Sequence, residues 1–203
     1  MQKQLISDII QMDASINPIS VSGWVRAFRS NRFIQINDGS TIHNLQCVVD
    51  FDTLDDELLK SVTVGAAISV SGPLVASQGQ GQALEIQVTE LSVLGKADPE
   101  EVKLTILSPK RHSLETLREQ AHLRIRTNTF GAVMRLRSKL SFAVHQYFQN
   151  NNFNYMHTPI VTGSDAEGAG EMFRVTNLDP VKPPLDDQGN IEFSKDFFDK
   201  ETH

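Results

Sequence analysis

The sequence has only one cysteine, Cys47, among its 203 residues. A single cysteine excludes a disulfide framework and a cysteine zinc site, and it fits a reducing, cytoplasmic setting. No apolar run reaches the roughly 18 residues that a membrane span needs. The N-terminal residues 1–18 carry Asp8 and Asp13 and lack a long apolar core, so we expect a short amphipathic helix there rather than a signal peptide.

Histidines with the spacing of metal ligands are also lacking, because the six that occur are scattered along the chain. Acidic residues outnumber basic ones, and the net charge is −6. The charge is unevenly distributed: residues 95–145 hold ten basic and five acidic side chains, whereas the segments on either side are acidic. Such a basic segment can meet a polyanion locally, although charge alone favours a solvated helix face.

The N-terminal half contains five runs with the patterns of short β-strands. They are residues 19–29, 32–37, 44–51, 66–77 and 83–94. A short helix with Thr53 at its N-cap is predicted at 53–62, between the third and fourth strands. This order predicts an OB-fold, a five-stranded Greek-key barrel that often binds oligonucleotides. Other small β-barrels share the pattern.

Arginines and aromatic residues alternate in the first two predicted strands. The arginines are Arg26, Arg29 and Arg32, and their neighbours are Trp24, Phe28 and Phe33. Arginine binds phosphates, and aromatic rings stack on bases, so the pattern is typical of an RNA-binding surface. We expect Trp24 and Phe28 to lie in the core. Phe33 and Gln46 belong to the second and third strands, where OB-folds read bases, so we expect them to face a ligand.

The middle of the chain is predicted to be helical. Residues 95–110 have the composition of a linker, and residues 111–127 read as a helix from Ser113 to about Ala121 followed by an extended basic piece. Residues 128–151 form the clearest helix, because apolar side chains recur at the helical period. Its broad apolar face requires a cover, either its own domain or a second subunit.

Residues 153–175 read as a strand, a loop and a second strand. The first strand, 153–161, ends near Pro159, and the second is predicted at 172–176. Between them lies a glycine-rich loop with three carboxylates, Asp165, Glu167 and Glu171, in which the backbone can approach a small ligand closely. From residue 127 onward the chain is too short to close a sizeable core.

Three segments together resemble the class II aminoacyl-tRNA synthetases. The helix at 128–151 followed by FNYMHTP resembles their motif 1, which forms the dimer interface. The runs RHSLETLREQAHLRIRTNTFGA and TGSDAEGAGEMFRV are similar to bacterial asparaginyl-tRNA synthetases, and GWVRAFRSNRFIQINDGSTIHNLQCVV resembles their anticodon-binding OB-fold. The resemblance implies an OB-fold domain at 1–95, a hinge region at 96–126 and the incomplete start of an antiparallel-sheet catalytic domain at 127–203.

The resemblance also implies roles for four barrel residues. Phe33 matches the phenylalanine that stacks on the central anticodon base, and Gln46 matches the glutamine that hydrogen-bonds the same base. Arg26 and Arg29 match the arginine-rich strand end that holds the anticodon loop. Phe28 stands where many relatives carry arginine, so the resemblance leaves open which of the two arginines does this work.

Four further positions match the synthetase catalytic domain. Ser164, Asp165 and Glu167 match the loop that closes over the amino acid, and the glutamate is expected to bind its α-amino group. Pro159 matches the motif 1 proline at the dimer interface. No residue of this chain is expected to act as a protein nucleophile.

The implied activity of the complete enzyme is ATP-dependent attachment of asparagine to its tRNA through an adenylate, with Mg2+. Motifs 2 and 3, which complete the ATP site, are not found in these 203 residues, so the chain alone is expected to be inactive and to bind ATP and Mg2+ incompletely. The expected partners are tRNA, asparagine and a second copy of the chain, in the cytoplasm and away from membranes. Two alternatives stay open: an aspartyl-tRNA synthetase and a non-catalytic OB-fold protein that binds RNA or dimerises.

Overall fold

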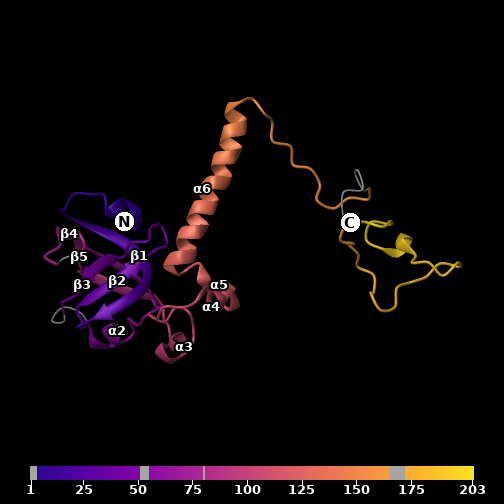
Figure 1. Cartoon of the computed structure of the whole chain (residues 1–203). Helices are drawn as coiled ribbons and strands as arrows, with labels where there is room; N and C mark the ends of the chain where they lie inside the picture. The colour runs from indigo at the N-terminus through magenta and orange to yellow at the C-terminus, as the bar shows by residue number, and fades with distance from the viewer. Residues whose placement is uncertain (1–3, 51–54, 80, 165–171) are drawn as a thin grey trace. The chain divides into compact units, whose positions relative to one another are not determined.

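The structure is a computed structural model that describes residues 4–50, 55–79, 81–164 and 172–203 (Figure 1). The chain divides into two compact units, Met1–Val144 and His145–His203. Within the described ranges, no helix has both the length and the apolar content that a membrane crossing requires.

A β-barrel forms most of the first unit. Its strands are β1 (Ser15–Arg29), β2 (Phe33–Asn37), β3 (Leu45–Val48), β4 (Ala67–Ala76), β5 (Leu84–Gln87) and β6 (Glu90–Gly95). They lie in the order β1-β2-β3-β5-β4-β6, and an additional pairing of β1 with β4 closes the barrel. The pairing of β3 with β5 is parallel, whereas the other pairings are antiparallel. The predicted OB-fold is therefore confirmed.

The expected fifth strand, 83–94, is wrong in one respect, because it is two strands, β5 and β6. The break lies opposite Gly72 and Pro73 of β4, and proline has no N–H to donate to a neighbouring strand. At this point the chain passes close over β4: a Cβ placed on Gly72 would lie 1.9 Å from the carbonyl oxygen of Gln87. Glycine is thus required here because of the close backbone approach.

The hydrophobic core fills the inside of the barrel. Alternate strand residues supply it, as expected for a sheet with one buried face. Fully buried examples are Val21, Ile34, Ile36, Ile68 and Ile86. The expected N-terminal helix is α1 (Ile6–Ile9), and both of its isoleucines are buried in the same core. The backbone N–H of Ile6 donates to Asp38 Oδ2 (2.8 Å), which anchors α1 to the loop after β2.

Four short helices differ in how well their sequences predicted them. They are α2 (Asp56–Lys60), α3 (Pro99–Lys103), α4 (Leu114–Glu119) and α5 (Ala121–Arg124). The cap of α2 is Asp55, which accepts from the N–H of Glu57, and the predicted cap Thr53 lies outside the described residues. The cap of α4 is Ser113, as predicted. The extended basic piece expected after α4 is wrong, because α5 follows at once, separated only by the non-helical backbone of Gln120.

The long helix α6 (Asn128–Asn150) is confirmed. The hydroxyl of Thr127 accepts from the N–H of Phe130 (3.4 Å) at its start. At its end Asn152 has a φ of 63°, the left-handed conformation that commonly follows a helix C-terminus.

The second unit has little regular structure in its described part. Neither of the strands expected at 153–161 and 172–176 is formed there. A strand needs a neighbour for its N–H and C=O groups, and here the pairing is limited to short contacts such as Thr162 with His203 (2.9 Å in both directions) and Val175 with Thr202 (2.9 Å). The 3-10 helix η1 (Phe193–Lys195) and the bridge between Leu185 and Ile191 are further short elements.

Candidate nucleic-acid interface

The outward side chains of β2, β3 and β5 form one face, here called the barrel face. It consists of Phe33, Gln35, Gln46 and Glu85. Strand pairing sets these residues side by side, because Gln35 lies opposite Gln46, and Gln46 lies opposite Glu85. Phe33 lies two residues before Gln35 on the same side of β2. The sequence prediction that Phe33 and Gln46 share the face of strands two and three agrees with this register.

A tight turn places Phe33 beside an arginine. Ser30 and Asn31 both have positive φ values (50° and 51°), as in the type I′ turns of β-hairpins, and the N–H of Arg32 donates to the carbonyl of Arg29 (3.0 Å). This turn sets Arg29 opposite Phe33 in the β1–β2 pair. Phe33 is 36% exposed, and the Arg32 guanidinium lies 5.9 Å from the centroid of its ring. The residue is therefore accessible for stacking.

Glu85 and Gln35 are the two residues of the barrel face that the sequence did not single out, and Glu85 has the more extensive contacts. Its side chain is buried and accepts hydrogen bonds from three neighbours: Gln46 Nε2 and Ser77 Oγ bond its Oε2 (both 2.9 Å), and Gln87 Nε2 bonds its Oε1 (3.1 Å). A carboxylate can only accept, so it fixes which end of the Gln46 amide faces it. The parallel pairing of β3 and β5 brings the two together, and no local sequence pattern reveals such a contact.

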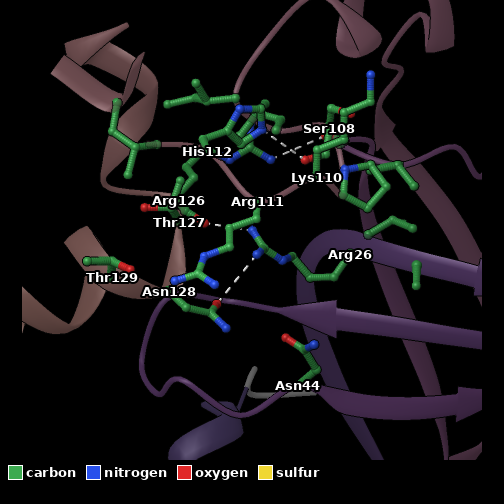
Figure 2. A pocket seen from close by; sticks show the side chains of 18 of the residues that line it. Arg26, Asn44, Ser108, Lys110, Arg111, His112, Arg126, Thr127, Asn128 and Thr129 are labelled. Carbon is green, nitrogen blue, oxygen red and sulfur yellow. Dashed lines mark hydrogen bonds between the residues drawn. The ribbon is translucent and has the colours of Figure 1, made fainter. Parts of the chain in front are cut away.

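Arg26 lies on β1 but points away from the barrel face. Its Nη1 donates to the carbonyl of Arg126 (2.6 Å), and its Nη2 donates to Asn128 Oδ1 (3.4 Å) (Figure 2). Burial lowers the pKa of the Arg26 guanidinium because the charged form is desolvated. Arg26 thus connects the barrel to the segment that precedes α6.

Trp24 was expected in the core, and that expectation is wrong. Its side chain is 40% exposed, and the Arg126 guanidinium lies 4.7 Å from its ring centroid, within the range of a cation–π contact. Phe28, by contrast, is partly buried and packs against the core as expected. The tryptophan therefore belongs to the junction between the barrel and α6.

The predicted amino-acid-binding residues are only partly described. Ser164 is exposed, and its N–H donates to Thr162 Oγ1 (3.2 Å). Asp165 and Glu167 lie outside the described residues. Pro159 is exposed.

Two kinds of reactive site find no support among the described residues. No group of three or more His, Cys, Asp or Glu side chains there is placed to hold a metal ion. Burial raises the pKa of the Cys47 thiol, which keeps it protonated and unreactive. The barrel face and the arginine beside it offer an exposed aromatic ring, side-chain amides and a guanidinium for contact with a ligand.

Two protein families match consecutive parts of the chain. The family described as "OB-fold nucleic acid binding domain" matches residues 19–94. The family described as "tRNA synthetases class II (D, K and N)" matches residues 113–183. The first match covers most of the barrel, and the second includes α6.

Curated relatives of this chain are asparagine--tRNA ligases. That of Cytophaga hutchinsonii is 53% identical over 188 residues, which cover 91% of this chain and 40% of the relative. That of Parabacteroides distasonis is 50% identical over 200 residues, which cover 97% and 42%. The chain therefore spans less than half the length of these relatives.

The fold of this chain also matches solved structures. The asparaginyl-tRNA synthetase from Pyrococcus horikoshii, complexed with asparaginyl-adenylate, has a TM-score of 0.71 at 21% identity, covering 86% of this chain and 40% of that one. At this identity the likeness concerns the fold.

Proposed function

We propose that this chain is part of an asparagine--tRNA ligase, which joins asparagine to its tRNA through an adenylate formed from ATP. The observation that carries the proposal is the identity of 50–53% to asparagine--tRNA ligases over more than nine-tenths of the chain. Aspartyl enzymes share the barrel and motif 1, so these features do not separate the two substrates. The identity of 50–53% to asparagine--tRNA ligases favours asparagine over aspartate. A cytoplasmic location follows from the proposal, because the tRNA substrate is there.

The barrel face binds the anticodon in this proposal. Phe33 is exposed enough to stack on a base, and Gln46 is held by Glu85 in a defined orientation for hydrogen bonding. Arg29 lies opposite Phe33 and is exposed, so its guanidinium can contact a phosphate of the same loop. Arg26 lies three residues before Arg29 on β1, where it braces the junction with α6.

The catalytic part begins after the hinge. The proposed domains are the anticodon-binding barrel at 1–95, the hinge region at 96–126 and the first part of the catalytic domain at 127–203. Ser164, Asp165 and Glu167 take the amino acid, and the Glu167 carboxylate pairs with its ammonium group. The described residues include no metal-binding group, so we place no Mg2+ ligand on them and derive no step through this ion.

A homodimer is part of the proposal, with Pro159 at the interface. Its support in the structure is a stripe of exposed apolar side chains along α6. The stripe residues are Val133, Leu136, Leu140, Val144 and Tyr147, which are 47–67% exposed. They are spaced three or four residues apart and therefore share one face of the helix. A second copy of the chain would remove this face from water.

Replacing Phe33 by alanine tests the proposed function. The variant loses one base stack, so we expect binding of asparagine tRNA to weaken by about 1–3 kcal/mol, roughly five- to 150-fold. Filter binding with the 203-residue chain and an unmodified transcript measures the change.

The matched control is Phe173→Ala, because Phe173 is 92% exposed and lies in the other unit. We expect this control to bind the tRNA like the unchanged chain. Equal affinities of the Phe33→Ala variant and the unchanged chain would show that Phe33 does not contact the RNA.

A further inference from the structure

A large cationic cavity lies between the barrel and the hinge region. This junction pocket has a volume of about 960 Å3 and is lined by β1, by the segment 106–114 and by the segment 126–129 (Figure 2). Its basic side chains are Arg26, Arg29, Lys110, Arg111, Arg126 and His112. Among the residues that the structure describes, no aspartate or glutamate lines this pocket. The chain as a whole has a net charge of −6, so the positive charge of this lining is a local feature.

Two of these arginines are held close together with uncharged partners. Arg26 donates to the Arg126 carbonyl and to the Asn128 amide oxygen, and Arg126 Nη2 donates to the Gly65 carbonyl (3.4 Å). Burial lowers the pKa of Arg126, and repulsion from Arg26 lowers it further. A bound anion would relieve this repulsion, because an opposite charge favours the protonated guanidinium.

The other basic residues are accessible. Lys110 and Arg111 are exposed, and they come from the segment that faces β1 across the pocket (Figure 2). Asn44, Ser108 and Asn128 line the same space and add uncharged hydrogen-bonding groups. Exposed cationic side chains combined with such polar groups suit phosphate oxygens, which accept several hydrogen bonds at once.

The junction pocket is continuous with the barrel face. Arg29 lines the pocket and lies opposite Phe33, while Gln35 lines the pocket and lies opposite Gln46. A nucleic-acid strand whose bases rest on Phe33 and Gln46 therefore has its next backbone phosphates at the pocket entrance. This continuity favours an RNA backbone over an unrelated anion as the ligand of the pocket.

We propose that the junction pocket binds sugar–phosphate backbone of the same tRNA whose anticodon lies on the barrel face, next to the bases that are read there. The inference rests on the proposed function, since it takes tRNA as the ligand. The pocket contributes affinity without sequence preference, because phosphates are the same in every RNA. The hinge region is then an RNA-binding element as well as a connection between domains.

The test is the salt dependence of tRNA binding by the double variant Lys110→Ala/Arg111→Ala. Each phosphate contact that is lost should reduce the slope of log affinity against log salt by about 0.7. We expect a reduced slope, and an affinity loss of the same factor for asparagine tRNA and for a tRNA with a different anticodon. Filter binding over a series of NaCl concentrations provides both readouts.

The matched control is Lys60→Ala/Lys182→Ala, which removes two exposed charges that do not line the pocket. It should keep the slope of the unchanged chain. An unchanged slope in the Lys110→Ala/Arg111→Ala variant would overturn the proposal. If Phe33→Ala still weakened binding in that case, the proposed anticodon role of the barrel would stand without the pocket.

A free nucleotide carries the same phosphate chemistry, so titration calorimetry with ATP alone forms a second arm. We expect no saturable ATP binding that depends on Lys110 and Arg111. Saturable binding that disappears in the double variant, together with an unchanged tRNA slope, would assign the pocket to a free nucleotide and contradict the RNA proposal. Melting followed by circular dichroism checks that both double variants are folded.

Discussion

Glu85 shows how one buried carboxylate can organise a binding face. It accepts from Gln46, Ser77 and Gln87, which come from three different strands or their ends. Gln46 is therefore held with its NH2 group toward β5, and its position on the barrel face does not depend on a ligand. The cost of ordering this glutamine is met during folding and does not reduce the affinity for RNA.

Replacing Glu85 by glutamine should destabilise the barrel. The new amide has one acceptor oxygen and one NH2 group, so a buried donor is left facing other donors. We expect the free energy of unfolding to fall by about 1–3 kcal/mol, measured by urea denaturation. Glu90→Gln is the control because Glu90 is exposed, and it should leave stability unchanged. Equal stability of the Glu85→Gln variant and the unchanged chain would contradict the account of this network.

At the residue scale, the sequence predicted types of residue better than their contacts. Their position on the second and third strands of an OB-fold identified Phe33 and Gln46 as ligand-facing residues, and the register of β2 with β3 places both on the barrel face. The exposure of Trp24 was missed because its partner, Arg126, lies 102 positions later in the sequence. Contacts of this kind arise from the tertiary fold, which a local pattern does not contain.

At the element scale, α6 carries a row of apolar side chains that stay exposed in the structure. Its apolar stripe, Val133 to Tyr147, is largely exposed, and exposed apolar stripes of this length mark interaction sites. The sequence already indicated that this helix needs a cover. The proposed homodimer supplies one.

Introducing a charge into the stripe tests the dimer. Leu140 is 62% exposed, so Leu140→Asp should leave the fold intact and place a carboxylate in the middle of the interface. We expect the variant to sediment as a monomer at protein concentrations at which the unchanged chain is a dimer. Ser141→Asp adds the same charge at an exposed neighbouring position, off the stripe, and should remain a dimer. A stripe variant that dimerises like the control would exclude α6 as the interface.

The elements also show where prediction from sequence reaches its limit. Strand patterns and the Ser113 cap located β1 to β4 and α4 well, because alternation and capping are local signals. The division of β5 from β6 depends on the close passage of Gln87 over Gly72. The strands expected at 153–161 and 172–176 did not form, because an apolar run becomes a strand only when a neighbouring strand pairs with it.

At the scale of the whole molecule, basic and acidic residues are concentrated in different segments of the chain. The segment 95–145 carries an excess of basic residues, and several of them line the junction pocket, whereas the rest of the chain is acidic. In the proposed function and the inference built on it, the barrel face and the junction pocket are two parts of one RNA-binding surface within the first unit. The proposal assigns specificity to the first part and salt-dependent affinity to the second.

The central claim is that the barrel face reads the anticodon of asparagine tRNA. The most direct measurement is filter binding of the unchanged 203-residue chain to two transcripts that differ only in the central anticodon base. We predict that the altered transcript binds about tenfold more weakly or worse, which corresponds to at least about 1.4 kcal/mol. Equal binding of the two transcripts would contradict the claim.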